Sequence, residues 1–283
     1  MSCAYDAREN AEKGCERMSK RSLLYAAAVV ILVGLLGISA VVGNGRKDDR
    51  PVMRVGYYNY LPYIANDAGG GARGIDAELA KEAFGRMGYR VEFVRIDWDE
   101  KDELLARHEV DCLWAGFVMT GREDGYQWAG PYLHSRHVVV VPADSDIRAL
   151  SNLAGRSIAV TAHSRTEGLL LYTETRVPHT AELYSFQELQ QTRAALFSGY
   201  YDAAAGNELA WSSLLKGRES EFRVLEQPLA VTELGVAFAK DADPALVKQL
   251  TGHLTQMHRD GTIAAVLEKN QADPAVAAEM ERE

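Results

Sequence analysis

Residues 22–45 form a run of 24 residues without a single charged side chain, SLLYAAAVVILVGLLGISAVVGNG. In a helix that rises about 1.5 Å per residue, about 20 such residues cross a bilayer core of roughly 30 Å. Lys20 and Arg21 precede the run directly, and positive charge on that side predicts a cytoplasmic N-terminus. We therefore expect a cytoplasmic segment at 1–21, a transmembrane signal anchor at 22–45 and an extracytoplasmic remainder, held at the cell membrane.

A cleaved signal peptide is the alternative reading of the same run. Val41, Val42 and Gly43 would make a tolerable small-residue cleavage site. Signal-peptide apolar regions usually run about 7–15 residues, however, and this one is longer. The sequence leaves both readings open, and either one exports the rest of the chain.

Charge and cysteine content exclude several classes for the exported part. Residues 51–283 contain 34 acidic and 23 basic residues, a net charge of −11, which is unlike the basic stripe of a nucleic-acid-binding protein. Cys112 is the one cysteine beyond residue 45, so an intrachain disulfide cannot form there. We expect Cys112 to be a small buried hydrophobe. No cofactor motif is visible, and His134 and His137 lack a third residue at metal-ligand spacing.

The exported part alternates between short apolar runs and longer helical patterns. Strands are expected at 53–58, 91–96 and 111–119, with helices between them at 74–89 and 99–108. Strands separated by helices of this length are typical of βαβ units with a parallel sheet.

The alternation restarts at HVVVVP (137–142), whose four valines indicate a strand buried on both faces. Further strands are expected at 157–160, 181–186, 202–206 and 231–239, and helices at 187–199, from about Thr166 and from Asp243-Pro244. Two α/β halves of about 80–90 residues each predict a two-lobed protein that binds a ligand between the lobes.

Eight segments occur in one order along the chain: RVGYYNYLPY (54–63), GIDAELAKEA (74–83), VEFVRIDWDE (91–100), VDCLWAGFVMTGRE (110–123), WAGPYLHSRHVVVV (128–141), LSNLAGRSIAVTAHSRTE (150–167), LFSGYYDAAAG (196–206) and MHRDGTIAAVLEK (257–269). Together they resemble the bacterial extracellular solute-binding proteins of the polar-amino-acid type, family 3, which are receptors of ABC importers. The resemblance implies a two-lobed α/β fold of the periplasmic-binding-protein type II class with hinge strands, preceded here by the transmembrane or signal helix.

The resemblance also implies domain bounds. The solute-binding domain would span 52–272, followed by a C-terminal tail at 273–283. Lobe one would comprise 52–138 and 231–272, and lobe two 143–226. The hinges would lie at 139–143 and 226–231.

Arg122 matches the arginine that grips the ligand's α-carboxylate in that family. A planar guanidinium suits this task because it makes two parallel charge-assisted bonds to a carboxylate. The alternative is that Arg122 is a solvated loop arginine paired with Glu123 or Asp124. The loop is also one residue shorter than the family pattern, with Gly121 in the gap.

Aromatic residues fill the positions where family members hold the ligand side chain. Tyr60 and Trp98 match the sandwiching rings, and Tyr57 would begin the same wall. A ring face can pack an apolar group or attract a cation. The resemblance also places Gly116 and Thr120 among the ligand-binding residues.

Ser164 and Arg165 match the positions in lobe two that close onto the ligand carboxylate. They open a helix, where Ser164 could equally serve as a plain N-cap. Asn207 departs from the family, which usually has an aspartate there to neutralise the ligand's ammonium. Glu208 could substitute for it. Val118 is a second departure, from a hydroxyl-bearing threonine.

Asp76 could face the ligand site, although we expect it to be the N-cap of the following helix.

These features predict a non-enzymatic solute-binding protein of an ABC importer. Its ligand would be an amino acid or a related small carboxylate-bearing solute, trapped by hinge closure, and its partners an ABC permease and the membrane. One alternative is a ligand-sensing subunit that works with a separate signalling partner. Another is an enzyme of the cyclic-acid dehydratase kind on the same fold, which would require a cleft acid with a shifted pKa.

Overall fold

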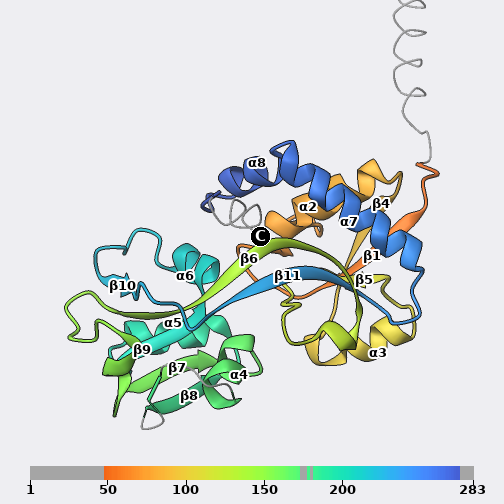
Figure 1. Ribbon diagram of the computed structural model, residues 1–283. Helices are drawn as coiled ribbons and strands as arrows, with labels where there is room; N and C mark the ends of the chain where they lie inside the picture. The colour runs from red at the N-terminus through yellow and green to blue at the C-terminus, as the bar shows by residue number, and fades with distance from the viewer. Residues whose placement is uncertain (1–47, 173–176, 179–180, 275–283) are drawn as a thin grey trace, which may run out of the picture. The chain divides into compact units, whose positions relative to one another are not determined.

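The computed structural model describes residues 48–172, 177–178 and 181–274 (Figure 1). The expected cytoplasmic segment and signal anchor, together with most of the C-terminal tail, lie outside the described residues. Every element below belongs to the compact unit Arg50–Glu283. Within the described ranges, no helix combines the length and the apolar composition needed to cross a bilayer.

The elements alternate much as the sequence predicts. The described strands are β1 (Val52–Tyr57), β2 (Ala65–Asn66), β3 (Ala72–Arg73), β4 (Arg90–Arg95), β5 (Cys112–Leu113), β6 (Gln127–Pro142), β7 (Ser157–Thr161), β8 (Glu182–Phe186), β9 (Ala203–Asn207), β10 (Phe222–Val224) and β11 (Ala230–Phe238). The described α-helices are α2 (Ile75–Arg86), α3 (Lys101–Ala106), α4 (Arg165–Tyr172), α5 (Leu189–Phe197), α6 (Glu208–Leu214), α7 (Pro244–Arg259) and α8 (Thr262–Lys269). Short 3-10 turns are η1 (Trp98–Glu100), η2 (Glu123–Gly125) and η3 (Leu150–Leu153).

The main sheet is mixed rather than parallel. Its strand order is β4-β1-β5-β11-β6-β9-β7-β8, with β10 also paired to β6. The β1–β4, β1–β5, β7–β8 and β7–β9 pairs are parallel, as the βαβ pattern predicts. The expectation of a parallel sheet is wrong for β6 and β11, which run antiparallel to their neighbours. These two strands connect the lobes, so they need not return in the direction that a helical crossover imposes.

Strand β6 is a single 16-residue strand that serves both lobes (Figure 1). Its first part pairs with β11 and its last part with β9 and β10. His137 pairs with both Ala230 and Asn207, so the transfer between lobes occurs there. The segment 139–143, expected to be a hinge, lies mostly in the part of β6 that pairs with β9 and β10.

Lobe one has its largest core between the sheet and helices α2, α7 and α8, which pack together on one face (Figure 1). The sequence of α7 explains both where this helix begins and which of its faces is buried. The Asp243 carboxylate accepts the Ala245 N–H at 2.9 Å, and Pro244 occupies the first turn. The buried side chains Val247, Leu250 and Leu254 recur on one stripe. Cys112 lies buried in the same core, which confirms its expected role.

Lobe two has one core on each face of its strands. Val138 and Val140 belong to one cluster, and Val139 and Val141 to the other. Alternate residues of a strand point to opposite faces, so four consecutive valines fill both cores. The prediction of a strand buried on both faces is confirmed.

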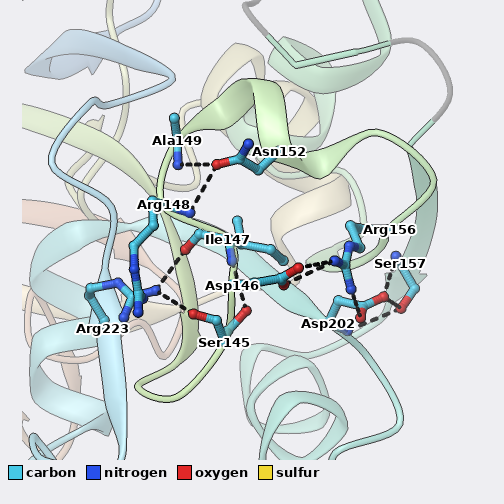
Figure 2. A network of polar contacts seen from close by, with 10 residues as sticks. All are labelled: Ser145, Asp146, Ile147, Arg148, Ala149, Asn152, Arg156, Ser157, Asp202 and Arg223. Carbon is cyan, nitrogen blue, oxygen red and sulfur yellow. Dashed lines mark hydrogen bonds and ion pairs between the residues drawn. The ribbon is translucent and has the colours of Figure 1, made fainter.

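A polar network fixes the segment between β6 and β7 in lobe two (Figure 2). The Arg223 guanidinium donates to the carbonyl oxygens of Ala143, Ser145 and Ile147 at 2.7, 3.2 and 2.6 Å. Arg156 pairs with Asp146 at 2.7 Å and with Asp202 at 3.4 Å (Figure 2). The network therefore ties β10 and the start of β9 to one loop.

Replacing Arg223 with methionine should lower the free energy of unfolding by about 2–4 kcal/mol. The reason is that three part-buried carbonyl groups lose charge-assisted donors, each worth about 1.5–3 kcal/mol before solvent compensates. Urea unfolding followed by circular dichroism measures this. Arg218→Gln, at an exposed arginine of the same lobe, is the matched control. A change below about 0.5 kcal/mol for Arg223→Met would contradict the role assigned to the network.

Candidate functional site

A continuous series of aromatic rings lies in lobe one. Tyr60 stacks on Tyr58 at a centroid distance of 5.5 Å and on Tyr63 at 5.4 Å. Tyr58 contacts Trp98 at 4.7 Å, and Trp98 meets the edge of Phe117 at 5.0 Å. Tyr58, Tyr60 and Trp98 are half-buried. We call these five residues the ring wall.

Tyr57 does not belong to the ring wall. It is buried in a separate cluster with Ala72 and Ala77, and its hydroxyl donates to Asn66 Oδ1 at 2.5 Å. The Tyr57 ring meets the Phe93 ring edge-on at 6.0 Å, whereas Tyr58 stacks on Tyr60 in the ring wall. Tyr58, which sequence reasoning did not single out, occupies the place expected for Tyr57.

Arg122 lies at the end of the ring wall. Its guanidinium carbon is 5.4 Å from the centroid of the Phe117 ring, and Nη1 donates to the carbonyl oxygen of Val118 at 3.1 Å. Burial lowers the pKa of Arg122, and the nearby Arg165 guanidinium lowers it further. Among the described residues no carboxylate lies within ion-pair distance of Arg122, so the alternative in which it pairs with Glu123 or Asp124 does not occur. The Glu123 carboxylate instead accepts the Gly121 N–H at 2.9 Å.

Arg165 reaches this place from lobe two. A Cβ built on Gly121 would lie 3.2 Å from Arg165 Nη2, so the guanidinium rests against the residue that precedes Arg122. Arg165 Nε is buried and has no hydrogen-bond partner among the described residues. The two lobes therefore meet with one arginine from each at the contact.

His137 holds the start of α4 through its contact with Thr166. Its Nδ1 lies 2.8 Å from Thr166 Oγ1 and its Nε2 lies 3.1 Å from Thr232 Oγ1. The Thr232 hydroxyl donates to the carbonyl oxygen of Ser135 at 3.2 Å, so Nε2 must be the donor in its own bond and Nδ1 accepts from Thr166. Burial, followed by the charges of Arg165 and Arg122, lowers the pKa of His137 to about 4. The histidine is therefore neutral at physiological pH and sets the position of Arg165 through Thr166.

Asn207 is fully engaged within the protein. Its Oδ1 accepts the Tyr63 hydroxyl at 3.0 Å and the Ala210 N–H at 3.2 Å, and its Nδ2 donates to the Ser135 hydroxyl. It caps α6 and links the ring wall to lobe two. The neighbouring Glu208 pairs with Arg136 at 2.9 Å.

Three further predicted positions have backbone roles. The Ser164 hydroxyl accepts the Glu167 N–H at 3.1 Å, as an N-cap does. Thr120 Oγ1 accepts the Glu233 N–H at 2.9 Å and so fastens the Arg122 loop to β11. Gly116 has a φ of +59°, and a Cβ there would lie 3.0 Å from the Tyr63 ring. A side chain at 116 would therefore disturb the ring wall.

Asp76 lies in the first turn of α2, behind this site, but it does not cap the helix. The expectation that it is an N-cap is wrong, because α2 begins after Gly74 without a side-chain cap. The fully buried Asp76 carboxyl accepts the Gly116 N–H at 2.5 Å and the Tyr132 hydroxyl at 3.0 Å. Burial raises its pKa to about 7, although both hydrogen bonds oppose that shift. Asp76 thus supports Gly116 from behind.

A cavity of about 400 Å³ lies elsewhere, between α6 and the residues after α8. Arg136, Glu208, Lys216 and Asn270 are among its lining residues, and none of the predicted ligand-binding residues lines it. The candidate functional site is therefore the place where Arg122, Arg165 and the ring wall meet. Among the described residues, no group of three or more histidine, cysteine or acidic side chains could hold a metal ion.

Comparisons with known proteins agree with the two-lobed architecture. L-cystine-binding protein TcyA of Bacillus subtilis (strain 168) is 23% identical to this chain over 265 residues, which cover 88% of this chain and 97% of TcyA. The crystal structure of Tv2483 bound to L-arginine has a TM-score of 0.68 at 25% identity, covering 77% of this chain and 89% of that one. The ancestral amino acid-binding protein AncCDT-1, a precursor of cyclohexadienyl dehydratase, shares the fold with a TM-score of 0.66 at 24% identity, covering 77% and 94% of the two chains.

The type II periplasmic-binding fold is thus common to this chain and to binding proteins of small solutes. The sequence model of the bacterial extracellular solute-binding proteins, family 3, matches residues 53–272, which is more than three quarters of the chain. The chain belongs to this family.

Proposed function

We propose that this protein binds a small carboxylate-bearing solute between its two lobes and presents it to an ABC permease. The observation that carries the proposal is the Arg122 guanidinium, half-buried at the end of the ring wall, with no carboxylate of the described residues paired to it. Leaving a charge partly desolvated and unpaired costs free energy, which a bound carboxylate would recover through two parallel hydrogen bonds. The ring wall would pack the solute's apolar part.

Hinge closure is the mechanism that follows. Arg165 of lobe two contacts Gly121 of lobe one, so a solute reaches Arg122 when the lobes separate. Strands β6 and β11 carry the chain between the lobes, and bending there would open and close the site. Closing would seal the solute away from water and so strengthen its ion pairs.

Of the relatives named above, TcyA binds cystine and Tv2483 is bound to L-arginine, and both solutes carry an α-carboxylate. Their names support a carboxylate-bearing solute for this chain. The description of AncCDT-1 as a precursor of cyclohexadienyl dehydratase points instead to the dehydratase alternative. The two acids that this alternative would require do not favour it. Asp76 is engaged by Gly116 and Tyr132, and Glu208 pairs with Arg136 outside the candidate site.

Membrane attachment through residues 22–45 is part of the proposal. It rests on the uncharged run and on the basic residues that precede it. A tethered receptor would stay near its permease, which raises the local concentration of loaded receptor.

A ligand screen tests the proposed function. The full-length chain, purified in a mild detergent, is titrated by calorimetry with the standard amino acids and with small mono- and dicarboxylates. Amides and alcohols of the same carbon skeletons serve as matched controls. We expect one or more carboxylates to bind and their amides to fail. A chain that binds the amide and the acid equally well would contradict a carboxylate-binding role for Arg122.

A further inference from the structure

Two guanidinium groups meet at the candidate site, one from each lobe. Arg165 Nη2 would lie 3.2 Å from a Cβ placed on Gly121, the residue before Arg122. The charges of Arg165 and Arg122 both lower the pKa of His137. His137 is neutral, so it neither adds to nor offsets their charge. The site therefore concentrates two positive charges where the lobes close.

The acidic groups near these arginines have other partners. Asp102 is a charged neighbour of Arg122, but its carboxylate accepts the Tyr126 hydroxyl and lies 3.6 Å from Lys101 Nζ. Glu123 is a charged neighbour of Arg165, but it is fully exposed and accepts the Gly121 N–H. Neither carboxylate lies within ion-pair distance of Arg122 or Arg165 in the part of the chain that the structure describes. Within these residues, the two guanidinium groups thus have no carboxylate paired to them.

The side chains that could accept a ligand ammonium are also occupied. The side-chain carbonyl oxygen of Asn207 accepts hydrogen bonds from the Tyr63 hydroxyl and the Ala210 N–H. Glu208 pairs with Arg136 beside the separate cavity. Asp76 lies fully buried behind Gly116. An α-amino acid would therefore bring a positive charge into a region that already holds two.

From this arrangement we infer that the ligand is a small dicarboxylate without an ammonium group, with one carboxylate on Arg122 and the other on Arg165. The inference rests on the proposed function and specifies its substrate class. Two carboxylates match the two unpaired guanidiniums in charge and number. The hydrocarbon spacer between them would pack on Tyr58 and Tyr60 of the ring wall.

Arg165 then acts as a specificity-determining residue that also couples binding to closure. It comes from lobe two, so its ion pair with the second carboxylate forms only when the lobes meet. The His137–Thr166 hydrogen bond fixes the first turn of α4, from which Arg165 projects. A monocarboxylate would use Arg122 alone and leave Arg165 unpaired.

Calorimetry with matched acids tests the inference on the full-length chain in detergent. The diacids are succinate, glutarate and adipate. Each is compared with the monoacid of equal carbon number (butyrate, pentanoate, hexanoate) and with its 2-amino analogue (aspartate, glutamate, 2-aminoadipate). We expect at least one diacid to bind at least about 10-fold more tightly than both of its partners, because charge-assisted hydrogen bonds of this kind favour binding about 10- to 100-fold.

Arg165→Gln supplies the decisive variant. It should weaken diacid binding by about 10- to 100-fold and leave monoacid binding within twofold of the wild type. Arg218→Gln is the control, and it should leave diacid affinity unchanged because Arg218 pairs with Glu221 and takes no part in the candidate site. Circular dichroism verifies that each variant is folded.

Different results would overturn the dicarboxylate inference and the proposed function. Carboxylates that bind without any preference for the diacid, or equal losses for diacid and monoacid in Arg165→Gln, would overturn the inference and leave the proposed function standing. Binding of the 2-amino analogue at least as tightly as the diacid would also overturn it. A chain that binds none of these acids, nor any carboxylate of the wider screen, would overturn the proposed function itself.

Discussion

Arg122→Gln should weaken binding of the carboxylate solute by about 30-fold or more. Removing one partner of a desolvated, hydrogen-bonded charge pair costs about 2–5 kcal/mol, and each 1.4 kcal/mol is a factor of ten. Glutamine keeps one donor for the Val118 carbonyl but loses the charge and the fork geometry. The loss should appear in the dissociation constant from calorimetry, with the free energy of unfolding changed by much less.

Arg218→Gln is the matched control for that experiment. Arg218 lies in lobe two, pairs with Glu221 at 2.5 Å and packs over the rings of Phe197 and Phe222. Its loss should leave solute affinity unchanged. Unchanged affinity in Arg122→Gln, or an equal loss in both variants, would show that Arg122 does not bind the carboxylate.

Asp76→Asn should change how stability depends on pH. Between pH 3.8 and about 7 the folded Asp76 keeps a proton that the unfolded chain has released, so this group makes the protein less stable as pH rises. Between about pH 4 and 6.5 the folded His137 lacks a proton that the unfolded chain binds, so this group makes the protein more stable as pH rises. The two slopes oppose each other across nearly the same interval.

The Asp76 slope amounts to roughly 4 kcal/mol over its interval and the His137 slope to roughly 3 kcal/mol, since one pKa unit corresponds to about 1.4 kcal/mol. The contributions of these two groups therefore nearly cancel in the wild type. Asparagine cannot titrate, so Asp76→Asn exposes the His137 slope, and the variant's free energy of unfolding should rise by about 3 kcal/mol relative to the wild type from pH 4 to pH 6.5. Urea unfolding at several pH values measures the difference. Parallel stability curves for the two proteins would show that Asp76 does not titrate in this range.

The sequence predicts the order of elements well, because short buried strands and amphipathic helices carry clear periodic signals. It predicts the sheet direction poorly at β6 and β11. An apolar strand that crosses between lobes has the same pattern as one that stays within a lobe, so only pairing in three dimensions distinguishes them.

Arg122 and Tyr60 were predicted from the resemblance to the family, and the structure places both in the candidate site. Tyr57 and Tyr58 show the limit. Tyr57 ends β1 and is buried beside Ala72 and Ala77, whereas Tyr58 follows it and belongs to the ring wall, so a shift of one residue exchanges their roles. His137 and Asp76 were missed because their partners come from distant parts of the chain.

Hydrogen–deuterium exchange, with and without the tightest-binding acid from the screen, tests most directly whether a solute is held between the lobes. We expect slower exchange in two separated peptides, residues 115–122 of lobe one and 161–167 of lobe two, and little change in the exposed Arg218 region. Protection confined to one lobe, or centred on the cavity beside α6, would contradict capture of the solute between Arg122 and Arg165.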